Sequence, residues 1–292
     1  MELPLVVGVD GSDSSLQAVD WAVDEAARHG LPLRLVHASR WERYEETLPS
    51  FGTERPSVEV LAEHVVASCA ERARLRKPDV KVSGEVTPDD AVDALLEESR
   101  QAFAVVTGNR GRSELPAILL GSVGLAVAAR AVCPVIVVRG AERNRNGELG
   151  EVILGVGDLT EDSTAVQFAL REAQVREAEL DAVRAWRRPA HEPVNQPPFM
   201  REAGALLREE QAAAIISDVL GRMERDPDKT PLRRDVVEGP AHKVLLAASE
   251  RADLLVVGAL RPHGHLGLQL GRVSHAVLHH SACPVAVVPQ QV

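Results

Sequence analysis

The chain has 292 residues, of which 45% are hydrophobic and 26% are charged. That length suffices for two ordinary domains, and the apolar content excludes a disordered or fibrous protein. The formal net charge of −10, without a long run of like charges, argues against general binding to nucleic acid or to an anionic membrane. The sequence shows neither a signal peptide nor an apolar run of membrane-spanning length, so we expect a cytoplasmic protein.

Two segments of the sequence recur 150 residues apart. Residues 131–138 (Ala-Val-Cys-Pro-Val-Ile-Val-Val) return as residues 281–288 (Ser-Ala-Cys-Pro-Val-Ala-Val-Val). Residues 103–108 likewise return as residues 253–258. Near the start of each half the spacing is 147 residues, a drift that insertion in a surface loop produces. The sequence is therefore a tandem duplication of a unit of domain size.

The duplication predicts two domains, residues 1–139 and 151–292, joined by a linker of residues 140–150. The linker is predicted because this segment is polar and contains glycine between two apolar runs. Each half closes on a strongly apolar strand, 135–138 or 285–288, which would be an exposed edge in an isolated unit. We therefore expect the halves to pack as an intrachain pseudo-two-fold pair, and a homodimer of whole chains stays open.

Short β-branched runs alternate with amphipathic segments through the first half. In chain order we predict a strand at 5–9, a helix capped by the serine-rich run 12–15 and stopped by Gly30, a strand at 33–37, a helix from 58 to 73, an edge strand at 80–86, a helix opening at 88–89, a strand at 103–107, a helix ending near 130, and a strand at 135–138. Strands joined by helical crossovers give an α/β fold. Each half is therefore predicted to form a doubly wound, five-stranded parallel sheet of order 3-2-1-4-5.

The predicted strand order reverses between the first and the fourth strand, and open α/β sheets bind ligands at that point. Asp10 follows the first strand, and the loop after the fourth strand reads Gly108-x2-Gly111-x9-Gly121-Ser122. Glycines let the backbone approach a ligand closely. Gly121 and Ser122 open the next helix, whose free N–H groups favour an anion. The pattern predicts a phosphate-binding loop.

These motifs resemble the universal stress protein family over almost the entire chain, which looks like a tandem two-domain member. The resemblance implies an adenine-nucleotide-binding domain type with ATP, with or without Mg²⁺, as the ligand. It implies that Asp10 contacts the ribose or adenine and that Val36 and His37 line the adenine side. The implied phosphate-side residues are Gly108, Arg110, Gly111, Gly121, Ser122 and Val123.

The two halves depart from the family pattern to different degrees. In the first half, Gly124 stands where many ATP-binding members have a second Ser or Thr. The second half keeps Gly258 and Gly271 and departs at several other positions. There, Gly157 takes the place of Asp10 and is followed by Asp158, Arg261 replaces the second glycine, and Arg272 replaces the serine, with Ser274 two residues later. We therefore expect the competent ATP site in the first half.

The resemblance favours a stress-response or signalling protein that acts as a nucleotide-dependent switch or scaffold. No general base or pair of metal-binding carboxylates accompanies the glycine loop, so we expect no enzyme beyond slow ATP hydrolysis. Two alternatives stay open. One is an interaction module that binds no nucleotide, and the other is an adenylating or ATP-cleaving enzyme.

Histidines and cysteines suggest further sites that we weigh against plainer roles. His275 and His279 are one helical turn apart and could bind a metal with His263 or His265, but no acidic residue accompanies them and we predict no metal site. The three cysteines are widely spaced, which argues against a disulfide framework. Cys133 and Cys283 each precede a proline at a strand start, and we expect them to be buried packing residues.

Overall fold

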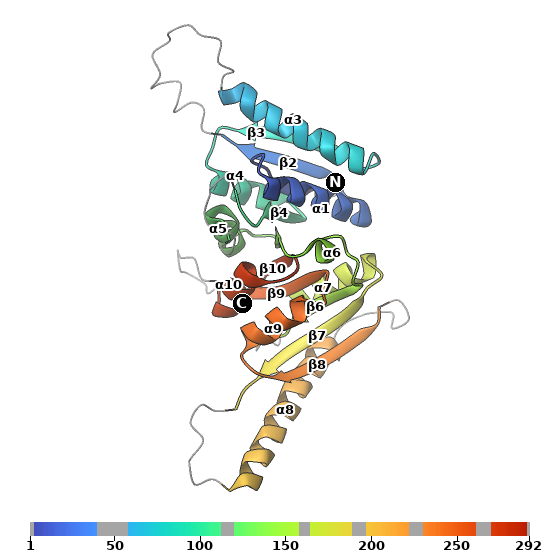
Figure 1. The fold of residues 1–292 in the computed structure, drawn as a ribbon, viewed down its shortest axis with the longest axis vertical. Coiled ribbons are helices and arrows are strands. Elements are labelled where there is room, and N and C mark those ends of the chain that lie inside the picture. The colour runs from blue at the N-terminus through green and yellow to red at the C-terminus, as the bar shows by residue number, and fades with distance from the viewer. Residues whose placement is uncertain are drawn as a thin grey trace. The chain divides into compact units, whose positions relative to one another are not determined.

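The protein is described from a computed structural model (Figure 1). The described residues are 3–39, 58–111, 120–157, 164–188, 197–221, 230–260 and 270–290. They form two compact units that meet in sequence between Arg139 and Gly140. The first unit is coloured blue to green in Figure 1, and the second runs on from green to red.

The first unit is a doubly wound parallel sheet. Its elements are β1 (Leu5–Gly8), α1 (Asp13–His29), β2 (Leu33–Ala38), α3 (Val58–Arg76), β3 (Val82–Thr87), α4 (Ala91–Glu98), a 3-10 turn (Ser99–Gln101), β4 (Ala104–Gly108), α5 (Ser122–Arg130) and β5 (Val135–Val138). The strands lie in the order β3-β2-β1-β4-β5, and each neighbouring pair is parallel. The predicted order 3-2-1-4-5 is confirmed, with β3 at the edge.

The second unit repeats this architecture. Its elements are α6 (Glu142–Arg145), β6 (Glu151–Gly155), α7 (Thr164–Val175), β7 (Glu179–Trp186), α8 (Pro198–Gly221), β8 (Leu232–Glu238), α9 (Ala241–Ser249), β9 (Leu254–Leu260), α10 (Arg272–His280) and β10 (Val285–Gln290). The strand order is β8-β7-β6-β9-β10, again with parallel pairs. None of the described helices combines the length and the apolar character that crossing a membrane requires.

Local capping signals set the ends of the first helix. The hydroxyl of Ser12 accepts a hydrogen bond from the N–H of Ser15 at 3.3 Å and caps α1. Gly30 ends α1 in the left-handed region, with φ at 67°. Both ends were predicted. In α4 the expected opening at 88–89 is wrong by one residue, because Asp90 is the cap that accepts from the N–H of Val92.

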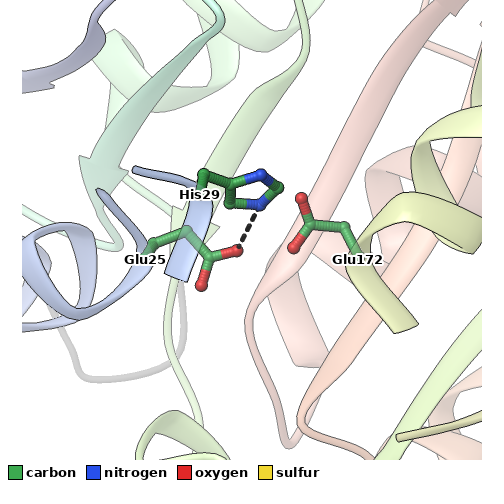
Figure 2. Close-up of side chains that lie close together, drawn as sticks. All are labelled: Glu25, His29 and Glu172. Atoms are coloured by element: carbon green, nitrogen blue, oxygen red, sulfur yellow. Dashed lines mark ion pairs between the residues drawn. The ribbon is translucent and has the colours of Figure 1, made fainter. Parts of the chain in front are cut away.

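A buried glutamate occupies the same position in the helix after the first strand of each unit. In α1, Oε1 of Glu25 lies 3.4 Å from Nε2 of His29 (Figure 2). The other oxygen, Oε2, accepts from Arg28. In α7, Glu172 pairs with Arg176 at 3.4 Å, also one turn later. Both glutamates are fully buried. The second pair follows the first by 147 residues, so the duplication kept a buried acid beside a basic side chain.

The segment expected to link the halves is built into the second unit. It carries α6, and Asn144 in that helix is only 2% exposed. Its side-chain amide donates to the carbonyls of Ala252 at 2.8 Å and Ser249 at 3.3 Å. The carboxylate of Asp253 accepts from the backbone N–H groups of residues 149 and 150. These bonds hold residues 140–150 against the loop that follows α9.

Cys133 and Cys283 are buried, as the sequence predicts. Cys69, Cys133 and Cys283 are all buried and free of disulfides. Burial raises the pKa of the Cys69 thiol above its ordinary value, because a thiolate is poorly solvated there.

Candidate functional site

A cavity of about 320 Å³ lies in the first unit, where β1 and β4 end. Small-molecule sites usually range from about 300 to 1,000 Å³, so this volume suits a ligand. The walls come from the loops after β1 and β4, the end of β2, and the helices α4 and α5. Every site residue that the sequence predicts lines this one cavity: Asp10, Val36, His37, Gly108, Arg110, Gly111, Gly121, Ser122 and Val123.

Asp10 joins the two sides of the point where the strand order reverses. Its Oδ1 accepts hydrogen bonds from the backbone N–H of Ser12 at 3.0 Å and from the Ser12 hydroxyl at 2.6 Å. A Cβ atom on Gly111 would lie 2.8 Å from Oδ2 of Asp10. The second carboxylate oxygen therefore lies next to the loop after β4. Asp10 is half-buried and the only carboxylate among the described residues that line the cavity.

The end of β2 forms a buried wall with one polar edge. Val36 and His37 are 2% and 9% exposed. Nδ1 of His37 lies 2.6 Å from the carbonyl oxygen of Val9. Because a carbonyl only accepts, the proton of a neutral ring is on Nδ1, and Nε2 keeps a lone pair. Ala91, Ala94 and Leu95 of α4 also line this wall, which suits a flat aromatic ligand.

The loop after β4 is tied to the start of α1 by residues that the sequence did not single out. The hydroxyl of Ser14 donates to Oδ1 of Asn109 at 2.7 Å and accepts from the backbone N–H of Arg110 at 3.1 Å. The carbonyl of Asn109 accepts from the N–H of Gly121 at 2.9 Å, which joins the loop to α5. The sequence indicates Ser14 only as part of the cap of α1, and no local pattern signals this contact.

The glycines of this loop differ in how much space the fold leaves for a side chain. A Cβ atom on Gly108 would lie 2.6 Å from the backbone oxygen of Ser14, a clash that the fold itself forbids. A Cβ atom on Gly121 would have its nearest neighbour at 3.5 Å, which is ordinary contact. Packing against α1 therefore requires glycine at position 108. Packing does not require glycine at position 121, whereas the close approach of a ligand would.

The start of α5 supplies donors for an anion. The N–H of Leu125 donates to the carbonyl of Gly121 at 3.2 Å, which is the bond expected at the start of this helix. The N–H groups of residues 122–124 precede it and have no acceptor within the helix. They form the positive end of the helix dipole. Arg110 is the only Lys or Arg among the described lining residues, so this end of the cavity can hold a phosphate.

Thr107 is a further polar residue of the cavity, for which the sequence predicts only a place within a strand. It is the penultimate residue of β4, is 5% exposed, and lines the cavity. In the part of the chain that the structure describes, its buried Oγ1 has no hydrogen-bond partner. The alternation of the strand could not reveal that this residue lines a cavity.

The corresponding cavity of the second unit is smaller and more apolar, at about 160 Å³. Gly157, Gly258 and Ser274 line it, together with Gln290 of β10. The side chain of Gln290 is so close to Gly258 that a Cβ there would lie 3.2 Å from its Cγ. Arg272 is the first residue of α10 and is not a described lining residue. The sequence positions 158 and 261, an aspartate and an arginine, lie outside the described residues.

A guanidinium stands in the second unit where the first has the His37 ring. Arg184 follows His37 by 147 residues. It donates to the carbonyl of Val156 at 3.3 Å and also to that of Gly157. His37 makes the equivalent bond to Val9. The second unit thus keeps the bond between its second strand and the end of its first strand, but it places a permanent positive charge beside its cavity.

The histidines of α10 lie as the sequence predicts, one turn apart. The ring centroids of His275 and His279 are 4.4 Å apart. Among the described residues, no group of three metal-ligating side chains forms around them. The two further candidates, His263 and His265, lie outside the described residues.

Comparisons with known proteins agree with this fold. The model of the Universal stress protein family matches residues 3–139 and again 150–289. A universal stress protein of Mycolicibacterium smegmatis is 32% identical over 297 residues, covering 98% of this chain and 97% of the relative. One from Mycobacterium tuberculosis is 33% identical, with the same coverage. The crystal structure of a universal stress protein from Archaeoglobus fulgidus has the same fold, with a TM-score of 0.68, 18% identity and full coverage of both chains. The chain belongs to the universal stress protein family and carries two copies of its domain in tandem.

Proposed function

We propose that the first unit binds ATP and that the protein acts in the cytoplasm as a nucleotide-dependent switch or scaffold in a stress response. One observation carries the proposal. A cavity of ligand size has a buried, mostly apolar wall at β2 and the start of a helix, α5, at its other end. This pairing suits a molecule with an aromatic base and phosphates. The free cysteines fit a reducing compartment.

The residues present fit this ligand part by part. Val36 and His37 lie beside the base, and the Asp10 carboxylate lies beside the ribose. The first-turn N–H groups of α5 hold phosphate oxygens, and Gly121 leaves the gap that a side chain would fill. Mg²⁺ would be held chiefly by the phosphates and water, since Asp10 is the sole carboxylate among the described lining residues.

The same set of residues favours binding over turnover. Hydrolysis needs a group that activates water in line with the terminal phosphate. Asp10 is held by Ser12, and Nδ1 of His37 is held by Val9 on the side of the base. Neither arrangement supplies a general base at α5. We therefore propose that ATP works here as a ligand whose presence changes the protein, with hydrolysis slow at most.

The test is a calorimetric titration of nucleotide-free protein with ATP. We expect one site per chain, because the cavity of the second unit has half the volume and carries Gln290. Gly121→Val should weaken ATP binding at least a hundredfold by blocking two or three phosphate contacts, each worth roughly 1.5–3 kcal/mol. The matched control is Gly271→Val, at the same helix position in the second unit, where a Cβ would meet nothing within 4 Å.

Other outcomes would favour the other functions. Absence of ATP binding together with an unchanged melting temperature would support an interaction module. Release of pyrophosphate in the presence of a co-substrate would support an adenylating enzyme. Two equal sites per chain would show that the second unit is also competent.

A further inference from the structure

The two units of this chain place one hydroxyl at the same point of the fold, but from opposite sides. In the first unit the third residue of the helix after the fourth strand is Gly124, and the penultimate strand residue is Thr107. In the second unit these positions, 150 residues later, hold Ser274 and Val257. The hydroxyl is thus on the strand in one unit and on the helix in the other.

The geometry of the first unit explains this exchange. A Cβ atom on Gly124 would lie 3.2 Å from Oγ1 of Thr107, closer than side chains normally approach. A serine at position 124 would therefore crowd the Thr107 hydroxyl and occupy nearly the same space. Either the strand or the helix can supply a hydroxyl here, but both together would be tight.

The buried Thr107 hydroxyl lowers the stability of the folded protein unless it forms a hydrogen bond. It is buried, and no described residue of the chain forms a hydrogen bond with it. Leaving such a group unpaired disfavours folding, whereas valine would fill the same volume without a polar atom. The second unit has that valine, Val257, which is 4% exposed. A ligand in the cavity is the natural partner for Oγ1, because Thr107 lines it.

We propose that Thr107 is a ligand-binding residue that donates its hydroxyl hydrogen to a phosphate of the nucleotide, in place of the hydroxyl that α5 lacks at Gly124. This inference rests on the proposed function. Thr107 lies next to the first turn of α5, where the N–H groups without helical acceptors gather. The base wall is at β2, which β1 separates from β4 in the sheet. The contact therefore belongs to the phosphate end of the ligand.

The experiment compares the affinities of ATP, AMP and adenosine for wild-type protein and for Thr107→Val. We expect the variant to bind ATP and AMP roughly ten- to hundredfold more weakly, as the loss of one hydrogen bond to a charged group predicts. Adenosine affinity should stay unchanged. The melting temperature of the nucleotide-free variant should equal or exceed that of the wild type, because an unpaired buried hydroxyl has been removed. A purely structural role of Thr107 would lower that temperature instead.

Three further variants keep the result interpretable. Thr107→Ser retains the hydroxyl and should retain most of the affinity. The double variant Thr107→Val with Gly124→Ser copies the second unit and should recover ATP and AMP binding. Val257→Thr, the matched change in the second unit, should leave ATP affinity unchanged.

Failure of this inference and failure of the proposed function look different. If wild-type protein binds no ATP, the proposed function is wrong and Thr107 has no phosphate to contact. If wild-type protein binds ATP and Thr107→Val binds it equally well, the nucleotide site stands and the role of Thr107 is wrong. An equal loss for adenosine and ATP would also overturn the assignment to phosphate.

Discussion

Ser14 donates its hydroxyl hydrogen to Oδ1 of Asn109 at 2.7 Å, across 95 positions of sequence. The same hydroxyl accepts from the N–H of Arg110 at 3.1 Å. Asn109 in turn accepts from Gly121 through its carbonyl. One serine of α1 therefore fixes the loop after β4, and that loop fixes the start of α5. The proposed phosphate end depends on a side chain from the other side of the point where the strand order reverses.

Ser14→Ala should loosen this loop and weaken ATP binding by roughly tenfold, because donors that are no longer preorganised lose part of their binding free energy. The folded protein should also lose about 1 kcal/mol of unfolding free energy with the half-buried hydrogen bonds. Calorimetry and urea denaturation measure the two effects. Ser83→Ala, the same change on the edge strand β3 and away from the cavity, is the control. Equal affinities for the two variants would contradict this role of Ser14.

Local patterns predicted most of the fold. The strand order followed from runs of β-branched residues and helical crossovers, and the ends of α1 followed from Ser12 and Gly30. Glycine spacing and strand order both point to the same edge of the sheet, and the family resemblance adds Val36 and His37; that these nine residues bind a ligand stays a prediction. All nine line one cavity. The pseudo-two-fold pairing of the halves stays a prediction.

Contacts between distant segments could not be predicted. Nothing near Ser14 marks it as the partner of Asn109, and nothing near Thr107 indicates that this residue lines a cavity and has an unpaired hydroxyl. The helix α6 fell in a stretch whose polar, glycine-containing composition suggested a linker. Its position depends on Asn144, whose acceptors are more than 100 residues away. The composition of a segment indicates its intrinsic conformational preference but not the tertiary contacts that it makes.

Gly108 and Gly121 should respond differently to the same substitution. Gly108→Ala brings a Cβ within 2.6 Å of the backbone of Ser14, so we expect a loss of about 1–3 kcal/mol in unfolding free energy, as overpacking typically causes. Gly121→Ala meets only ordinary contacts and should leave the nucleotide-free protein nearly as stable. Thermal melts without nucleotide measure both variants. Equal melting temperatures would show that α1 can move to accept the extra methyl group.

The stability of the second unit should depend on pH through Asp181. This residue of β7 is fully buried, and Arg233 donates to its Oδ2 at 2.8 Å. Burial nevertheless raises the pKa of Asp181 above its ordinary value of 3.8, because desolvation outweighs the attraction of the two guanidinium groups nearby, Arg233 and Arg251. Burial raises the pKa of Glu151 in the same cluster for the same reason.

A carboxyl with a raised folded-state pKa takes up a proton on folding. The charged form disfavours folding at neutral pH, and that penalty is relieved as the pH falls through the folded pKa toward 3.8. Asp181→Asn removes this titration. The unfolding free energy of the wild type should therefore rise relative to that of the variant as the pH is lowered from 7 toward 4. Urea denaturation across this range measures the unfolding free energy of both proteins. The prediction would be contradicted if the wild-type value minus the variant value stayed constant or fell as the pH was lowered.

Asn144 should anchor residues 140–150 to the second unit. Its side-chain amide is buried and donates to the carbonyls of Ala252 and Ser249, so Asn144→Ala leaves both acceptors without this donor. We expect a loss of about 1–3 kcal/mol in unfolding free energy and faster proteolysis between residues 140 and 150. The matched control is Asn146→Ala, which removes an exposed amide whose partner is Glu148 and should change stability by less than about 0.5 kcal/mol. If both variants were cleaved at the wild-type rate, the segment would be held by contacts other than Asn144.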